Sequence, residues 1–221
     1  MTVFHPKLED LPSEFAVFPL AGALLLPRGK LPLNVFEPRY LAMILDSLAA
    51  GRLFGMIQPD PHAATNGDEP GLYRVGCLGR LSSFNETDDG RLLITLTGLI
   101  RFTVAAELDP RAGYRRVRAD FAAFTDDLPR TRPQVLIERE KILVALRTYF
   151  SRRSVEANWD VIRGLSDDTL VITLAMACPF EAVEKQALLE APSDADRAAT
   201  LLALLQMGAA GPDLPPGHSV S

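Results

Sequence analysis

One stretch decides the architecture of the first half of the chain: Asp88-Asp89-Gly90-Arg91-Leu92-Leu93-Ile94-Thr95-Leu96-Thr97. An Asp-Gly pair between two extended segments is a strong signal for a β-hairpin turn. After the turn, Leu92, Ile94 and Leu96 fall on one face of a strand, and a leucine and two threonines fall on the other. This alternation predicts a strand with one buried face, so we expect Ile94 to lie in the core.

Short apolar runs separated by turn residues flank this hairpin on both sides. They predict strands over residues 15–20, 31–36, 52–58, 73–84 and 114–124. The second of these runs contains Pro32, which has no N–H to donate to a strand ladder and is therefore expected at a sheet edge or a bulge. Strands of this spacing predict a small barrel or twisted sheets packed together.

One helix interrupts the strands, and we expect it to plug or cap the barrel. Pro38 suits the first helical turn, where the missing N–H costs no hydrogen bond. The leucines and the isoleucine at positions 41, 44, 45 and 48 form one apolar stripe, and Gly51 suits the end of the helix. We therefore expect Leu45 to be buried.

The sequence changes period after residue 125. Residues 126–133 are rich in charge and proline and predict a linker. Beyond it, apolar residues recur at helical spacing from Val135 to Tyr149, and further helices are predicted as far as Gly208. The fold class is therefore α+β. The expected parts are a β-barrel subdomain over residues 1–125, an α-helical bundle over 126–208 and a flexible tail over 209–221.

Composition and charge exclude several classes of protein. The chain has 221 residues with 23 basic and 28 acidic side chains, and its net charge of −5 argues against a dedicated nucleic-acid binder. Two cysteines exclude a disulfide scaffold and indicate a reducing compartment. The longest uncharged stretch, residues 15–27, is too short to cross a membrane, and the acidic N-terminus does not resemble a signal peptide. We therefore expect a cytoplasmic protein with no membrane partner.

No constellation of residues predicts catalysis. The three histidines, His5, His62 and His218, lie in loop or terminal sequence without metal-ligand spacing. The block Pro27-Arg28-Gly29-Lys30 lacks the glycine spacing and the Ser/Thr of a phosphate loop, and no Gly-x-Ser-x-Gly elbow occurs. The sequence therefore predicts no catalytic residue, no metal site and no cofactor.

The basic cluster of the chain consists of Arg111, Arg115, Arg116 and Arg118. Two explanations are open for it. One is contact with phosphate groups of RNA, although only Tyr114 offers a ring for base stacking. The other is a polar outer strand face balanced by neighbouring aspartates, which the balanced charge of the chain favours.

Three blocks near the N-terminus resemble the opening of the substrate-binding domain of the Lon protease family. They are Phe18-Pro19-Leu20, Leu26-Pro27-Arg28-Gly29 and Leu31-Pro32-Leu33-Asn34-Val35-Phe36-Glu37-Pro38-Arg39-Tyr40. Gly76 and the block Gly98-Leu99-Ile100-Arg101-Phe102 resemble later landmarks of that domain.

The helical half resembles the segment that follows in Lon, through Lys185-Gln186-Ala187-Leu188-Leu189-Glu190, Arg197 and Leu201. The resemblance covers residues 14–205, nearly the whole chain. It implies a PUA-like pseudo-β-barrel with a plug helix, followed by a helical bundle. Because no ATPase motif and no Ser-Lys protease domain follow in this sequence, we expect a stand-alone, non-catalytic domain that recognises polypeptides or unfolded segments.

The candidate surface for a polypeptide is the seam around the predicted strands 31–36 and 52–58 and the loop 59–71. Aromatic rings and a flexible thioether suit adaptable apolar recognition. Core packing is the alternative for each candidate, and for Phe36 and Tyr40 it would take the form of a hydrophobic staple at the start of the helix. The candidate peptide-binding residues are Phe36, Tyr40, Phe54 and Met56.

The family motifs also have structural explanations. Glu37 is placed to favour the positive end of the helix, and Arg39 is expected to tie that helix to a neighbouring loop. Lys185, Glu190 and Arg197 are expected to form surface ion pairs within the bundle. The rival to polypeptide recognition is a PUA-like, RNA-associated module that uses the arginine cluster and binds with a steep salt dependence.

Overall fold

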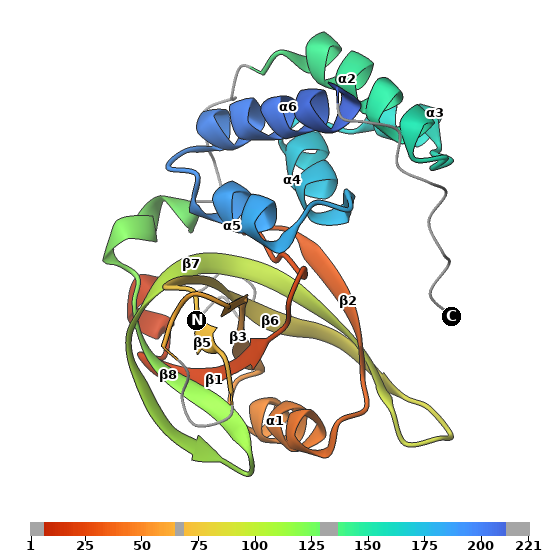
Figure 1. The fold of residues 1–221 in the computed structure, drawn as a ribbon. Helices are drawn as coiled ribbons and strands as arrows, with labels where there is room; N and C mark the ends of the chain where they lie inside the picture. The colour runs from red at the N-terminus through yellow and green to blue at the C-terminus, as the bar shows by residue number, and fades with distance from the viewer. Residues whose placement is uncertain (1–6, 65–68, 129–136, 211–221) are drawn as a thin grey trace. The chain divides into compact units, whose positions relative to one another are not determined.

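A computed structural model describes residues 7–64, 69–128 and 137–210 (Figure 1). The chain divides into two compact units, residues 1–132 and 133–221. Among the described residues, every strand lies in the first unit and every α-helix but one lies in the second. The α+β class predicted from the sequence is therefore confirmed.

The first unit carries the strands, one α-helix and two short 3₁₀ helices. Its strands are β1 (Glu14–Pro19), β2 (Lys30–Val35), β3 (Leu53–Ile57), β4 (Pro59–Asp60), β5 (Gly71–Leu72), β6 (Val75–Glu86), β7 (Leu92–Arg111) and β8 (Tyr114–Asp120). Its helices are η1 (Leu8–Asp10), α1 (Pro38–Ala49) and η2 (Ala122–Asp127).

Five of the strands close into a ring. They pair in the order β7, β6, β3, β1 and β8, and β8 pairs again with β7. β7 takes part twice because it is 20 residues long and changes partner along its length, from β6 over residues 92–103 to β8 over residues 103–111. Register shifts in both pairings mark irregularities that let the strand bend, and Figure 1 shows β7 curving across the barrel.

β2 lies at the edge of the sheet. In the described part of the chain it pairs only with β7, in antiparallel register. Pro32 stands in the middle of this strand, opposite Thr95, so the edge position predicted for the proline is confirmed. The outer edge of β2 is thereby left without a partner strand among these residues.

The core of the barrel is built around the buried ring of Phe102. The ring of Phe15 meets it edge to face, with 5.0 Å between the centroids. A Cβ added at Gly55 or Gly76 would lie 2.9 or 2.5 Å from atoms of the Phe102 ring. These two strand positions therefore exclude any larger residue, which explains why Gly76 interrupts an otherwise apolar run.

One of the two burial predictions is confirmed and the other is wrong. Ile94 is buried, as the alternating strand predicts, whereas Leu45 on α1 is 61% exposed. α1 packs against β1, β3 and β8. Its buried stripe begins one residue earlier than the predicted one, at position 40 in place of 41. Ser47 can be buried on that face because its hydroxyl donates to the Met43 carbonyl at 2.7 Å. The buried residues of α1 are Tyr40, Met43, Ile44 and Ser47.

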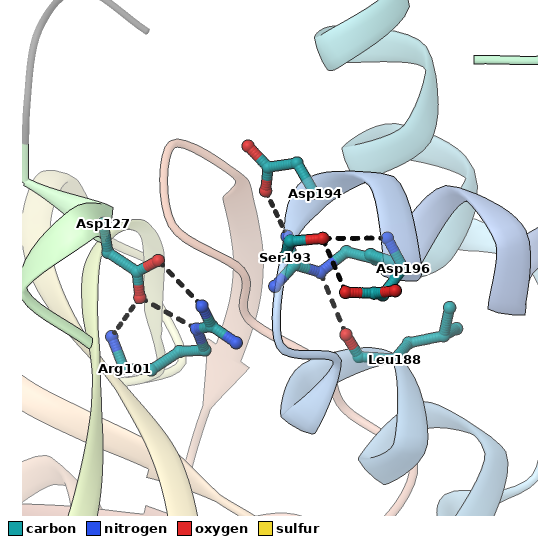
Figure 2. A network of polar contacts seen from close by, with 7 residues as sticks. Arg101, Asp127, Leu188, Ser193, Asp194 and Asp196 are labelled. Carbon is teal, nitrogen blue, oxygen red and sulfur yellow. Dashed lines mark hydrogen bonds and ion pairs between the residues drawn. The ribbon is translucent and has the colours of Figure 1, made fainter. Parts of the chain in front are cut away.

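The strand predicted over residues 114–124 ends earlier, at Asp120, and η2 follows it. Asp127, which the sequence places in the linker, is buried and bound to Arg101 (Figure 2). Its carboxylate accepts hydrogen bonds from Arg101 Nε (2.9 Å), Nη2 (3.0 Å) and the backbone N–H (3.0 Å). The linker prediction is therefore wrong for this residue, and positions 129–133 lie outside the described residues.

The second unit contains only α-helices among its described residues. They are α2 (Arg139–Arg152), α3 (Trp159–Gly164), α4 (Asp167–Ala177), α5 (Ala182–Glu190) and α6 (Asp194–Ala210). Gly208 does not end α6, because it lies inside the helix and a Cβ there would come within 2.5 Å of the Tyr149 ring on α2. Val135 and the tail beyond Ala210 lie outside the described residues.

Candidate functional site

The four candidate peptide-binding residues do not share a surface. Phe54 and Met56 are both buried, and they lie on the face of β3 opposite to Gly55, whose added Cβ would meet Phe102 in the barrel core. α1 packs against β3 as well. Tyr40 is also buried, and its ring stacks on that of Phe18 with 4.1 Å between centroids. The alternative of core packing thus holds for these three, while Phe36 is 61% exposed.

Phe36 belongs to a different apolar surface from the seam predicted above. Phe84 on β6 and Leu93 on β7 are also exposed, and the strand register places them close to the end of β2. Leu93 lies opposite Asn34 of β2, and Phe84 lies opposite the neighbouring Ile94. We call Phe36 and Leu93 the hairpin-tip surface, and Figure 1 shows the β6–β7 hairpin extending beyond the barrel at this end.

Exposed apolar side chains lie on both faces of the β6–β7 hairpin, and Phe84 lies on the face opposite to Leu93 of the hairpin-tip surface. Leu93 points away from the core face that carries Ile94, and Phe84 shares the face of Ile94 but lies at the margin, where it is exposed. The guanidinium of Arg91 lies 5.8 Å from the centre of the Phe36 ring. The alternation already marked Leu93 as outward-facing, but no pattern in the sequence marked Phe84.

The family block at the start of α1 has a structural role. Arg39 Nη1 lies 2.5 Å from Glu69 Oε1 and Arg39 Nε lies 3.1 Å from Glu37 Oε2. Glu69 ends the loop between β4 and β5, and the next residue, Pro70, accepts a 2.7 Å hydrogen bond from the buried Arg115. The prediction that Arg39 ties the helix to a neighbouring loop is confirmed.

Tyr114 joins β8 to α1, and this contact predicts a stability change at alkaline pH. Its hydroxyl donates to Asp46 Oδ2 at 2.7 Å. Burial, followed by the hydrogen bond to Asp46 and its charge, raises the pKa of Tyr114 to about 12. An unfolded tyrosine ionises near pH 10, so the contribution of Tyr114 to stability is complete below about pH 10 and is lost as the pH rises towards about 12.

We expect Tyr114→Phe to lower the free energy of unfolding by about 1 kcal/mol at neutral pH, because it removes a partly buried hydrogen bond. We also expect the variant to lose less stability than the parent between about pH 10 and pH 12. Urea unfolding at several pH values measures both effects. Parallel curves for the two proteins across this interval would show that Tyr114 titrates normally.

The arginine cluster is neutralised by acidic side chains within the first unit. Arg115 is buried, and the other three lie on the surface of β7 and β8 or at their connection. The three surface arginines agree with the polar outer face given as one explanation, but the buried Arg115 does not, and the acidic partners are not the neighbouring Asp109 and Asp120. The pairing leaves little net positive charge for phosphate groups. The acidic partners are Asp46 for Arg111 (3.2 Å), Glu107 for Arg115 (2.7 Å), and Glu14 for Arg116 (3.8 Å) and Arg118 (2.7 Å).

The side chain of Arg197 links α5 to α6 in the second unit. Arg197 is buried; its Nε donates to the Leu188 carbonyl at 2.9 Å, and its Nη1 lies 2.5 Å from Asp194. At the same connection Ser193 Oγ accepts from the backbone N–H of Asp196 at 3.1 Å, which caps the start of α6 (Figure 2). The surface ion pair predicted for Arg197 is therefore wrong, because the side chain links α5 to α6 from inside.

Lys185 is buried as well, so the prediction of a surface ion pair is also wrong for it. Burial lowers the pKa of Lys185, and burial raises the pKa of the Cys178 thiol nearby to about 12. Glu190 accepts a 2.7 Å hydrogen bond from Gln186 one turn earlier on α5. These polar groups help to position α5 and give no sign of a nucleophile, because the thiol stays protonated at neutral pH.

Within residues 7–64, 69–128 and 137–210, no three His, Cys, Asp or Glu side chains are grouped so that they would hold a metal ion. No helix within these ranges has the length and apolarity needed to span a membrane.

Comparison with known proteins gives one family. The model of the substrate-binding domain of ATP-dependent protease La (LON) matches residues 14–207. Lon protease 2 of Myxococcus xanthus is 29% identical over 118 residues, which are 51% of this chain and 13% of that protein. The Lon protease of Anaeromyxobacter dehalogenans is 28% identical over the same length, with the same shares. The chain thus matches a small part of these curated relatives.

Two solved structures are similar in fold. The Lon N-terminal domain protein from Xanthomonas campestris has a TM-score of 0.59 and 22% identity, covering 87% of this chain and 98% of that one. The N-terminal domain of the Mycobacterium avium complex Lon protease has a TM-score of 0.56 and 15% identity, covering 87% and 97%. At these identities the likeness establishes the Lon N-terminal domain fold.

Proposed function

Because the chain belongs to the family of substrate-binding domains of ATP-dependent protease La (LON), we propose that it is a non-catalytic module that recognises unfolded segments of other polypeptides. In this proposal the barrel is a PUA-like pseudo-barrel with α1 as its plug, followed by a helical bundle, and the protein works in the cytoplasm without chemistry of its own.

The observation that carries the proposal is the open edge of β2 beside the hairpin-tip surface. An extended polypeptide can add to a sheet edge through its backbone, so the pairing itself does not depend on the sequence of the ligand. On β2 the donors for such pairing lie on either side of Pro32, which has no N–H to donate. Exposed apolar side chains next to the edge would add contacts with apolar residues of the ligand. An unfolded chain offers both extended backbone and apolar side chains, whereas a folded protein hides most of them.

The rival reading as an RNA-associated module has less support. The four arginines that would contact phosphate each face an acidic partner, and the whole chain carries a net charge of −5. Binding to RNA would require these partners to be displaced or the net repulsion to be overcome. Polypeptide recognition asks for no such rearrangement.

The experiment measures binding of fluorescently labelled α-lactalbumin that has been reduced and carbamidomethylated, and is therefore permanently unfolded. We expect Phe36→Ser and Leu93→Ser each to weaken binding about fivefold, because each removes an apolar contact worth about 1 kcal/mol. Leu8→Ser is the matched control for Leu93→Ser, since Leu8 is 43% exposed and Leu93 is 44% exposed. Equal losses for the two leucine variants would contradict the assignment of the site.

A further inference from the structure

Two hollows adjoin on the second unit along one side of α2. One measures about 500 Å³ and is lined by α2 and α6, with Val144, Ala145, Ala209 and Ala210 as its apolar members and Glu140 and Lys141 as its charged ones. The other measures about 290 Å³, and its lining includes Arg139, Arg147 and Arg163. Glu140 and Val144 line both hollows, so an apolar trough passes directly into a basic one.

The arginines of the basic hollow are held in place by neighbouring side chains. Arg139 Nη1 lies 2.6 Å from Asp167 Oδ1, and its Nη2 donates to the Arg163 carbonyl at 2.8 Å. The guanidinium of Arg147 lies 5.2 Å from the centre of the Trp159 ring. Because these groups are already ordered, a ligand that binds them has less side-chain entropy to remove.

One arginine of the basic hollow has no acidic partner within the described residues. Arg139 is paired with Asp167, and Arg163 lies 3.6 Å from the highly exposed Asp160. Arg147 forms no ion pair with any described acidic residue, and its guanidinium lies over the Trp159 ring. A carboxylate of a ligand would pair with Arg147 and gain charge-assisted hydrogen bonds.

Glu140, Val144 and Arg147 share one stripe of α2, because they are spaced by four and three residues. Val144, at the centre of the stripe, is 62% exposed although it stands between the two hollows. A ligand lying along this stripe would place apolar side chains in the trough between α2 and α6 and acidic side chains beside Arg147.

We propose that these two hollows form a second polypeptide-binding site, whose ligand is a segment of another protein that carries apolar residues next to acidic residues. The proposal rests on the proposed function for the polypeptide nature of the ligand. The composition of the segment follows from the chemistry of the two linings.

The test uses the full 221-residue chain and two synthetic peptides that share leucines at helical spacing. One peptide carries four glutamates after the leucines, and the other carries four lysines at the same positions. We expect the acidic peptide to bind about tenfold more tightly at low salt, and this difference to shrink as salt is added. Equal affinity for both peptides, or no binding of either, would overturn the proposal.

Charge reversal locates the site. Arg147→Glu is expected to weaken binding of the acidic peptide about tenfold and to strengthen binding of the lysine peptide. Arg74→Glu makes the same charge change at an exposed arginine of the first unit and is expected to leave both affinities unchanged. Equal effects of the two substitutions would mean that the peptide responds to net charge and would contradict the site.

The apolar trough is tested in the same titration. Val144→Ser is expected to weaken both peptides about threefold to tenfold, and Val183→Ser, on α5 and 64% exposed, is the matched control with no expected effect. Circular dichroism confirms that each variant is folded. If the acidic peptide binds only after residues 211–221 are removed, that segment of the chain itself occupies the trough and the proposal is wrong. The proposal is also wrong if an RNA oligonucleotide competes at Arg147 more strongly than the acidic peptide.

The two assays distinguish failure of the second site from failure of the proposed function. The unfolded α-lactalbumin assay with Phe36→Ser reports on the hairpin-tip surface of the first unit, whereas the peptide assay with Arg147→Glu reports on the second unit. Loss of binding in the first assay with no effect of Arg147→Glu in the second would leave the proposed function standing and remove the second site.

Discussion

Replacing Arg101 by alanine is expected to lower the free energy of unfolding by about 3–5 kcal/mol, because it leaves the carboxylate of Asp127 buried without its guanidinium partner. Arg101 donates two side-chain hydrogen bonds to that carboxylate. The ring of Phe124 covers one face of the guanidinium, with 4.5 Å between the guanidinium carbon and the ring centroid. Urea unfolding followed by circular dichroism measures the loss.

The control for this prediction is the double variant Arg101→Ala with Asp127→Ala. Removing both charges avoids a stranded buried carboxylate, so we expect the pair to be more stable than Arg101→Ala alone. A loss below about 1 kcal/mol for Arg101→Ala would show that the pair is dispensable and that η2 is held by its apolar contacts.

Gly98→Ala is expected to lower the free energy of unfolding by roughly 3 kcal/mol or more, because the added Cβ has no room. It would lie 2.1 Å from the carbonyl oxygen of Leu26, which is backbone and not the end of a flexible side chain. The two segments cannot easily separate, since Gly98 N–H donates to Gly29 and Gly98 accepts from Arg28 at 2.9 and 2.8 Å. Thermal unfolding reports the effect as a lowered melting temperature.

The same substitution at Gly164 is the comparison. Gly164 ends α3, and a Cβ there meets no atom within 4 Å. We expect Gly164→Ala to leave stability unchanged or to raise it by about 0.5 kcal/mol, because alanine has less freedom to lose on folding. Equal losses at both positions would contradict the close approach at Gly98.

The strands were predictable because their signals are local. The Asp-Gly turn predicted where β7 begins, and the alternation after it predicted which face of β7 is buried. Ile94 is buried on that face. Pro32 indicated an edge strand because proline cannot donate to a second neighbour. Neither inference required knowledge of what packs on the strand.

The buried face of α1 was not predictable from apolar residues alone. Leu45 fits the helical stripe, yet Ser47 is buried in its place because a hydroxyl can bond to the preceding turn. The distribution of apolar residues alone does not show which of two neighbouring helix faces is buried when one of them includes a small polar residue. The structure decides through the shape of the surface that β1, β3 and β8 present.

The candidate peptide-binding residues were also predicted only in part. The sequence singled out Phe36, which is exposed, together with Phe54 and Met56, which are buried on the face of β3 opposite to Gly55. The pairing of β7 with β8 brings Arg115 to Glu107. Contacts between residues far apart in the sequence, such as Arg101 with Asp127, leave no periodic signal and were therefore missed.

The central claim is that the chain prefers unfolded polypeptide, and one titration tests it most directly. The unmodified chain is titrated against native α-lactalbumin and against the same protein after reduction and carbamidomethylation, with an RNA oligonucleotide as the opposing ligand. We predict saturable binding to the unfolded form at least about tenfold tighter than to the native form, with weak absolute affinity because the ligand must be ordered. Equal affinity for the two forms, or binding to the RNA alone, would contradict the account.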